Sequence, residues 1–505
     1  MVVQHNMQAM NANRMLNVTT STQAKATEKL SSGYKINRAA DDAAGLTISE
    51  KMRKQIKGLD RASTNAEDGV SSVQTAEGAL TEVHSMLQRM NELAVQASNG
   101  TNSESDRSAI QDEVNQLTTE IDRVSETTKF NETYLLKGQD GKKTINMNAH
   151  DAGLAGKLVD NGDGTAAFTM DSLKAGDKVS IGGKNYTIGG TDTDVTALID
   201  AANAALKKDT DKFSLKIGDN EFQVVKDGKI LDKDGKQLYV ASAANAATPA
   251  TFDAKTSTFT TTASFTSTAA NTPKIDNAAL TVDNLKEIAS LSGKTTTVGA
   301  DTVTVMTDAK NADGIDDTDA SIITKENAYK LAANELAAAN KIGDTEGASS
   351  VTNNNDGTFS IKVGQAKVAN ALSFSLHVGA DADMTNKIEV DIESMDSASL
   401  GIKGLNVKDK TGNAATYAID AIADAVAKVS EQRSALGAVQ NRLEHTIANV
   451  DNVVENTTSA ESRIRDTDMA EEMVNYSKNN ILAQAGQSML AQANQSNQGV
   501  LSLLQ

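Results

Sequence analysis

One apolar repeat constrains the fold of this chain more than any other feature. Between about Asp42 and Asn99, apolar residues recur at alternating steps of three and four, which is the spacing of one helix face. The repeat shifts once, by an extra step of three near Val73. A continuous helix over this range would be roughly 85 Å long, well beyond the helices of ordinary globular domains. The pattern therefore predicts a long helix packed lengthwise against other helices.

Two further stretches repeat this pattern. A helix-stop signal follows Asn99, and Ser103 with Asp106 forms a capping-box pattern for a second helix. The apolar seam of that helix covers residues 110–124, and we expect it to fold back on the first helix because the connection is short. A third seam with the same spacing covers residues 419–454. We therefore expect an antiparallel coiled-coil bundle of long helices, formed by both ends of the chain.

The middle of the chain, from about residue 142 to residue 370, has a different character. Both prolines fall here, and β-rich runs are separated by Asp-Gly and Gly-Gly pairs, which are hairpin-type turn signals. We predict short helices at 193–207 and 325–341. We predict strands at 179–181, 213–217, 221–225, 302–305 and 359–363. The expected fold class is thus mainly α, with a β-rich α+β region inserted between the helical ends.

The outermost segments, residues 3–30 and about 458–505, differ from the long helices. They are rich in Ala, Gln, Asn and Met, and their apolar stripes are thin. Helices of this kind are marginal in isolation and depend on partners for stability. Apolar side chains that a single chain has little means to bury indicate an assembly surface. The residues that we assign to polymerisation and terminal packing are Ile481, Leu482, Met489, Leu490, Val500, Leu501, Leu503 and Leu504.

The composition excludes several classes of partner. The formal net charge is −18, whereas a protein that binds nucleic acid or an anionic membrane needs a basic face. We therefore expect neither as a partner. No run of about 18 apolar residues is present, so no membrane span is expected. The amino terminus lacks an apolar run of signal-peptide length, so the chain either stays in the cell or leaves without a cleaved signal.

No catalytic, metal or cofactor site is expected. The chain has no cysteine, and its five histidines include no HExxH pattern. No phosphate-binding loop of Walker type is present, and the Asp-Gly turns do not supply the alternating oxygen ligands of an EF-hand. An enzyme carried by the middle region is therefore an alternative with little support. A glycan- or mucin-binding role for residues 142–370 stays open.

Two segments resemble the terminal signatures of bacterial flagellins. The first is Leu-Ser-Ser-Gly-Tyr-Lys-Ile-Asn-Arg-Ala-Ala-Asp-Asp-Ala-Ala-Gly-Leu, at residues 30–46. The second is Ser-Arg-Ile-Arg-Asp-Thr-Asp-Met-Ala-Glu-Glu, at residues 462–472, and similar segments follow at 479–486 and 491–495. The resemblance is long and lies at both ends of the chain, in the order that the family has.

The resemblance implies how the chain is organised. Residues 1–42 and 456–505 would form a terminal coiled coil, the inner tube of a filament. Residues 43–141 and 371–455 would form a helical inner rod domain. Residues 142–370 would be the variable, surface-exposed outer domain. Flagellins are exported without a cleaved signal peptide and polymerise into the extracellular filament of the bacterial flagellum, which serves motility, so we expect the same structural, non-enzymatic role here.

The resemblance also implies partners. These are further copies of the chain, the flagellar export chaperone and export apparatus, and the hook-junction and cap proteins. The flagellin-sensing Toll-like receptor of animal hosts is a further expected partner, and Arg89, Leu93 and Glu113 correspond by position to its contact residues. For the protein's own function, the alternative interpretation of these residues is a solvated or subunit-facing helix surface.

A short linker joins the first helix to the long one. A glycine there is suited to cap the first helix, and two aspartates are suited to the start of the next. In the family this linker connects tube to rod and contacts neighbouring subunits, while the alternative is a simple connection. The linker residues that we single out are Gly33, Asn37, Arg38, Asp41 and Asp42.

A hook-junction protein is the structural alternative to a filament subunit, because the two kinds of protein share their terminal helices. The closeness of both terminal signatures favours the filament subunit. For such a subunit, we expect that deleting residues 500–505 weakens polymerisation while the rod domain stays folded.

Overall fold

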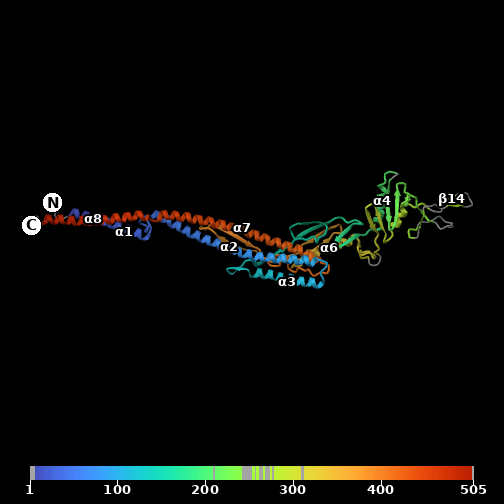
Figure 1. The fold of residues 1–505 in the computed structure, drawn as a ribbon, viewed down its shortest axis with the longest axis horizontal. Coiled ribbons are helices and arrows are strands. Elements are labelled where there is room, and N and C mark those ends of the chain that lie inside the picture. Colours follow the sequence, from blue (N-terminus) through green and yellow to red (C-terminus); the bar gives the residue numbers. More distant parts are fainter. Residues whose placement is uncertain are drawn as a thin grey trace. The chain divides into compact units, whose positions relative to one another are not determined.

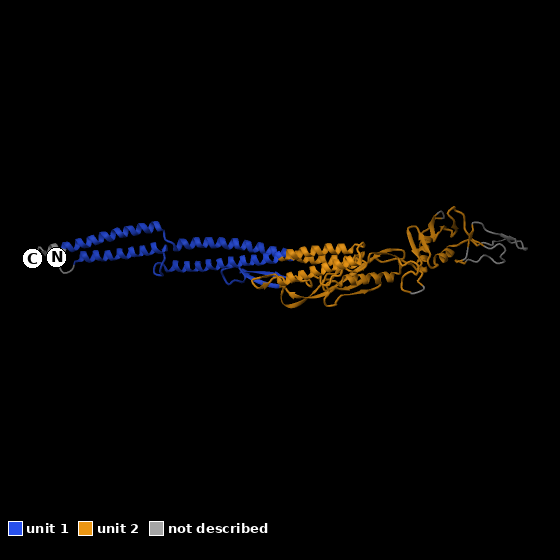
Figure 2. Cartoon of the chain, turned by 60° about the horizontal axis from the view of Figure 1, so that its bottom comes forward, with its two compact units in different colours: residues 1–78, 372–392, 432–505 blue, residues 79–371, 393–431 orange. Residues whose placement is uncertain are grey.

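The chain divides into two compact units, which Figure 2 draws in different colours. Unit 1 comprises Met1–Gly78, Leu372–Ile392 and Gln432–Gln505. Unit 2 comprises Ala79–Ala371 and Glu393–Glu431. Two long helices contribute to both units, α2 (Ala43–Ser98) and α7 (Asn413–Arg465). This computed structural model describes residues 6–208, 211–241, 253–255, 258–260, 265–267, 273–275, 278–308 and 312–502.

Two helices of unit 1 come from opposite ends of the chain, α1 (Met7–Ser32) and α8 (Met469–Ser502). They lie side by side and run in opposite directions (Figure 1). Near the chain ends, Nδ2 of Asn6 donates to the carbonyl oxygen of Ala493 at 3.0 Å. At the other end of the pair, Nζ of Lys29 lies 4.0 Å from Oε2 of Glu472.

The parts of α2 and α7 in unit 1 are also antiparallel. Oγ of Ser63 donates to Oδ1 of Asp451 at 3.0 Å, and Nη2 of Arg433 donates to Oε1 of Glu77 at 2.8 Å. Apolar side chains of the predicted seams are buried here: Leu59, Ala66, Val73, Ala76, Leu436, Leu443 and Val450. The prediction of long antiparallel helices from both ends of the chain is confirmed.

The stretch before α7 differs from the expectation that residues 371–455 are helical. It begins with an antiparallel hairpin of β21 (Leu372–His377) and β22 (Lys387–Ile392), with a 3-10 turn, η1 (Met384–Asn386), between them. Every second residue of β22 is buried, because its sequence alternates between apolar and charged residues. The hairpin packs on the long helices through a small core of Ala66, Val378, Ile388 and Leu443.

In unit 2, α3 (Glu104–Thr127) begins with the predicted capping box, which is confirmed. The irregular segment between β22 and α7 is held to α3 by hydrogen bonds at two places. Oε1 of Gln111 accepts the N–H of Val407 at 2.7 Å. Oδ1 of Asp122 accepts the N–H of Ser397 at 2.7 Å. Unit 2 thus has a helical part in which chain segments from both sides of the insert are joined.

The inserted region is entered and left through a two-stranded pair of β3 (Gln139–Asn146) and β20 (Gln365–Asn370). Beyond it, one hydrophobic core is shared by a four-stranded sheet in the order β18-β19-β5-β4, a three-stranded sheet in the order β17-β7-β6, and a helix. The elements are β4 (Gly156–Asp160), β5 (Thr165–Met170), β6 (Lys178–Ile181), β7 (Lys184–Ile188), β17 (Ile322–Ile323), α6 (Lys325–Ala339), β18 (Ser350–Asn353) and β19 (Thr358–Lys362).

A second core belongs to a five-stranded sheet in the order β10-β9-β8-β15-β16, with two helices packed against it. Its elements are α4 (Asp192–Ala204), β8 (Lys212–Ile217), β9 (Asn220–Val225), β10 (Ile230–Leu231), α5 (Val282–Ala289), β15 (Thr295–Val298) and β16 (Asp301–Thr304). Three short pairs complete the described strands: β1 (Lys129–Phe130) with β2 (Thr133–Tyr134), β11 (Tyr239–Val240) with β12 (Phe259–Thr260), and β13 (Phe265–Ser267) with β14 (Pro273–Ile275).

The expected fold class, helical ends with a β-rich insertion, is confirmed. The predicted strands correspond to β6, β8, β9, β16 and β19, and the predicted short helices correspond to α4 and α6. The glycines of the predicted turns have positive φ, for example 86° at Gly164 and 89° at Gly357. The sequence patterns did not predict α5, the β3–β20 pair or the sheet orders.

Candidate assembly site

The outward faces of α1 and α8 carry most of the exposed large apolar side chains of the described residues. The exposed fraction is 69% for Met7, 67% for Val474, 66% for Ile481 and 63% for Met489. The others on these two helices are Met10, Met15, Val18, Met469, Met473 and Leu482. Among the described apolar residues of the pair, only Ala26 and Ala483 are buried. The α1–α8 pair therefore buries little of its own apolar surface.

All of these side chains except Met7 line shallow grooves along the pair. One groove lies on α8 and includes Met473, Val474 and Ile481. A second lies between the helices, with Met15 on one wall and Met489 on the other. Grooves lined by apolar atoms and open to solvent are suited to receive apolar side chains of a neighbouring helix.

The residues predicted for polymerisation fall only partly within the described side chains. Ile481, Leu482 and Met489 are exposed on the grooves, and Leu490 is half-buried. The backbone of α8 includes Val500 and Leu501, whose side chains lie outside the description. Leu503 and Leu504 lie outside the described residues altogether.

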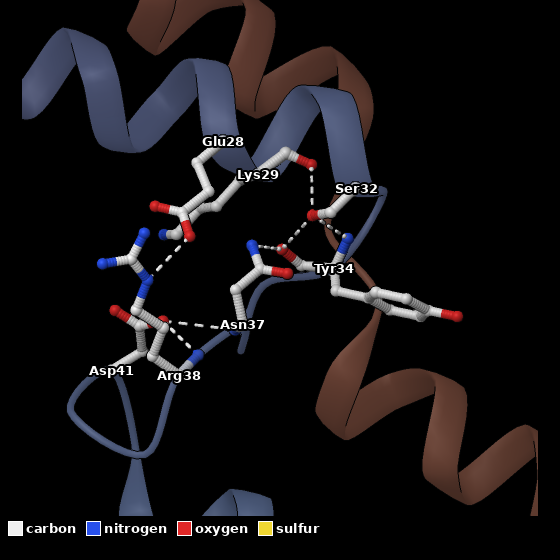
Figure 3. A network of polar contacts seen from close by, with 7 residues as sticks. All are labelled: Glu28, Lys29, Ser32, Tyr34, Asn37, Arg38 and Asp41. Carbon is white, nitrogen blue, oxygen red and sulfur yellow. Dashed lines mark hydrogen bonds and ion pairs between the residues drawn. The ribbon is translucent and has the colours of Figure 1, made fainter.

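The linker between α1 and α2 is folded by local hydrogen bonds (Figure 3). Gly33 ends α1 with a φ of 77°, and its N–H donates to the carbonyl oxygen of Lys29 at 2.8 Å. Oδ2 of Asp41 accepts the N–H groups of Asn37, at 3.2 Å, and Arg38, at 2.9 Å. These two backbone bonds, the one from Arg38 first, hold the pKa of the Asp41 carboxyl below its ordinary value.

Further contacts place the other predicted linker residues. Nε of Arg38 donates to Oε1 of Glu28 on α1 at 3.0 Å (Figure 3). Nδ2 of Asn37 donates to the carbonyl oxygen of Tyr34 at 3.2 Å. Oδ1 of Asp42 accepts the N–H of Gly45 at 2.9 Å in the first turn of α2. The prediction that a glycine caps α1 is confirmed, and Asp42 caps the start of α2.

This linker is also joined to the one between α7 and α8. The N–H of Lys35 donates to the carbonyl oxygen of Arg465 at 2.7 Å, and the N–H of Thr467 donates to that of Gly33 at 3.0 Å. The Arg465 guanidinium carbon lies 4.7 Å from the centroid of the Tyr34 ring, which is a cation–π distance. This contact between Tyr34 and Arg465 was not predictable from the sequence, since no local spacing relates residues from opposite ends of a chain.

The residues expected to meet a receptor lie on α2 and α3 in unit 2. Nε of Arg89 donates to Oε1 of Glu113 at 2.9 Å, and its Nη1 donates to Oε2 of Glu92 at 3.0 Å. The hydrogen bond to Glu113 is the main cause that raises the pKa of the Arg89 guanidinium. Leu93, in contrast, is only 1% exposed, so its side chain belongs to the core and has no access to a partner.

Within the described part of the chain, no group of three or more His, Cys, Asp or Glu side chains is placed to hold a metal ion. No described helix combines the length and apolar character needed to cross a bilayer.

Comparisons with known proteins agree with the terminal signatures. The bacterial flagellin N-terminal helical region matches residues 3–140, and the bacterial flagellin C-terminal helical region matches residues 419–504. A flagellin of Clostridium tyrobutyricum is 38% identical, covering 99% of this chain and 100% of that protein. A flagellin of Salmonella muenchen is 36% identical, covering 97% of this chain and 96% of that protein.

A solved structure of FliC from Burkholderia pseudomallei is 20% identical and covers 74% of this chain and 99% of that one. Its TM-score is 0.26, so the family assignment rests on the sequence matches alone. Those matches extend over nearly the whole length of the chain and of its relatives. The chain belongs to the bacterial flagellin family.

Proposed function

We propose that the exposed apolar faces of α1 and α8 bind further copies of this chain, which is a structural subunit of the bacterial flagellar filament. One observation carries the proposal. The α1–α8 pair exposes ten large apolar side chains, whereas Ala26 and Ala483 are the only buried apolar residues described on it. A helix pair that buries so little of its own apolar surface is stabilised mainly by its contacts with neighbouring subunits.

Burial between copies supplies the free energy that the isolated pair lacks. Apolar surface removed from water contributes roughly 25 cal/mol per Å². Because that burial takes place only in the assembled state, ordering of the ends and polymerisation are coupled. The acidic surface, with a net charge of −18, keeps the free subunits soluble.

The joined linkers support a division of the chain into a tube-forming part, a rod-forming part and an outer part. Residues 1–42 and 456–505 would form the inner tube, and residues 43–141 and 371–455 the inner rod domain. Residues 142–370 would face the medium, and the β3–β20 pair is the connection through which that region is entered and left. We assign to the linker residues, Asp41 foremost, the task of holding tube and rod in a fixed relation while neighbouring subunits pack around them.

The extracellular filament is the place where the chain acts, and we propose that it arrives there without a cleaved signal peptide. The export apparatus would receive it unfolded, and the absence of cysteine fits such threading because no disulfide can form on the way. An export chaperone would cover the apolar groove of α8 until assembly. Hook-junction and cap proteins would meet the same terminal helices at the two ends of the filament.

Recognition by the animal flagellin-sensing Toll-like receptor is a separate proposal, incidental to assembly. It is supported by the exposed ion pair of Arg89 with Glu113, which offers a polar surface on α2 and α3. Binding of the purified chain to the receptor ectodomain should weaken on Arg89→Ala. Equal binding by Arg89→Ala and the unchanged chain would contradict a receptor contact at this surface.

The assembly proposal is tested by replacing one exposed apolar residue of α8. Ile481→Ser should raise the critical concentration for polymerisation by about tenfold, because the apolar contact would be lost in every copy. Ile and Ser have similar helix propensity, so α8 itself should be little affected. The matched control is Val159→Ser on β4, which removes another exposed apolar residue, 44% exposed, from the inserted region.

Light scattering and sedimentation would give the critical concentration, and circular dichroism would check the helical content. The proposal predicts a normal critical concentration for Val159→Ser and a raised one for Ile481→Ser. It would be contradicted if Ile481→Ser polymerised normally, or if the two variants were impaired equally.

A further inference from the structure

All of the sulfur in this chain is in methionine. The sequence has 15 methionines and no cysteine, the other side chain that peroxide oxidises readily. A peroxide acting on the protein therefore has methionine thioethers as its main targets. Which methionines it reaches first depends on their exposure.

Exposure separates the methionines by element. Every described methionine of the α1–α8 pair is at least half exposed: Met7, Met10, Met15, Met469, Met473 and Met489. Elsewhere Met90, Met147, Met170 and Met395 are buried, and Met52, Met86 and Met306 are half-buried. Outside the two helices, the exposed methionine among the described residues is Met384, 72% exposed in the turn of the β21–β22 hairpin.

We propose that the six exposed methionines of α1 and α8 are oxidation sites that control polymerisation. In the free subunit, a methionine sulfur attacks one oxygen of hydrogen peroxide. The S–O bond forms as the O–O bond breaks, and water leaves after a proton shift. The sulfur is oxidised by two electrons and the peroxide is reduced by two, giving methionine sulfoxide.

The sulfoxide acts through the grooves that these methionines line, with the exception of Met7. Met473 lies with Val474 and Ile481 on α8, and Met15 with Met489 between the helices. A sulfoxide oxygen is a hydrogen-bond acceptor that water hydrates in the open groove, and a neighbouring subunit that packs apolar side chains into the groove removes that water. Burying it there costs free energy in every copy, whereas in the free subunit it stays hydrated.

The inference rests on the proposed role of these faces in assembly. It adds that sensitivity to oxidation differs before and after polymerisation. Subunits are sensitive before they polymerise, and the assembled filament protects the same sulfurs by covering them. Methionine sulfoxide reductases, with a thiol as electron donor, would return the side chains to thioethers and restore assembly. Oxidation would thus act on the supply of subunits and spare the finished filament.

The test uses the purified full-length chain, treated with hydrogen peroxide and then freed of it. Peptide mass spectrometry should find sulfoxide at the six methionines of α1 and α8 and at Met384 before it appears at Met90 or Met147. The critical concentration should rise by about tenfold or more once the terminal methionines are oxidised. Incubation with methionine sulfoxide reductases and dithiothreitol should reverse the rise.

A variant with all six terminal methionines changed to leucine removes the sulfur and keeps the groove apolar. It should polymerise after peroxide treatment as it does before, whereas Met384→Leu, the matched control, should lose assembly on oxidation as the unchanged chain does. In preformed filaments, the same peroxide treatment should oxidise Met384 faster than Met473 or Met489.

Three results would overturn the proposal. They are normal polymerisation of chain whose terminal methionines are oxidised, an equal loss of assembly in the six-leucine variant, and no recovery after reduction. If the six-leucine variant did not fold, oxidation and its reversal in the unchanged chain would still decide the matter. Failure of the untreated chain to polymerise would instead contradict the proposed function itself.

Discussion

In the linker between α1 and α2, single exposed residues hold the backbone in its conformation. Asp41 is on the surface, yet its carboxylate holds two successive backbone N–H groups in place. The bonds require the charged form, and this is why the pKa of Asp41 is lowered. A group with a lowered pKa in the folded state stabilises that state above its unfolded pKa, and the stabilisation is lost as the pH falls through the folded value.

We therefore predict that Asp41→Asn increases hydrogen exchange of a peptide covering residues 33–42 at neutral pH. In the unchanged chain, protection of this peptide should be constant at neutral pH and fall only below about pH 4. Exchange measured by mass spectrometry, corrected for intrinsic rates, would show this. Asp60→Asn, on the exposed side of α2, is the control and should leave the peptide protected. Full protection in Asp41→Asn would contradict the assigned role.

For single residues, the sequence predicts those roles that depend only on adjacent residues of the chain. Gly33 as a cap and Asp42 at a helix start follow from local rules of helix termini. The stacking of Arg465 on Tyr34 does not, because it depends on how the two ends of the chain pack. The burial of Leu93 could have been expected, since Leu93 lies three residues after Met90 of the apolar seam, on the same side of α2.

The packing of the β21–β22 hairpin on α2 depends on the absence of a side chain at Gly69. A Cβ atom on Gly69 would overlap Cδ1 of Leu376 on the hairpin and would lie 3.3 Å from Cδ1 of Leu443 on α7. A Cβ on Gly78, in the same helix, would meet nothing within 4 Å. The two glycines therefore offer a matched pair, because helix propensity is the same and only the packing differs.

We predict that Gly69→Val lowers the free energy of unfolding by about 1–3 kcal/mol more than Gly78→Val does, since it overpacks a filled contact. Urea unfolding of the purified monomer, followed by circular dichroism, would measure the difference. Equal destabilisation by the two substitutions would mean that the hairpin does not pack closely on Gly69.

The long helices were predictable because their apolar repeats are long and regular. The boundaries of α2 lie close to those expected, whereas α7 begins six residues before the seam at 419–454 and ends eleven residues after it. The hairpin has a readable signal as well, since β22 alternates between apolar and charged residues. The helical expectation for residues 371–412 followed the family resemblance and not these residues. In this stretch, the local alternation of apolar and charged residues predicted the structure better than the family resemblance did.

For the whole molecule, the sequence predicted that both ends join and that the middle is inserted between them. It could not predict the sheets of the insert, because their order depends on pairing between distant strands. In the five-stranded sheet, for example, β8 pairs with β15 across α5 and several intervening strands. Short strands with similar alternation do not specify such partners.

We have proposed that assembly belongs to the two ends of the chain. Helical reconstruction of the polymerised chain by electron cryomicroscopy would test this proposal. We expect that Met473, Ile481 and Met489, all exposed in the single chain, become buried between copies at the centre of the filament. A filament in which these side chains remain in contact with solvent, while residues 142–370 make the contacts between copies, would contradict it.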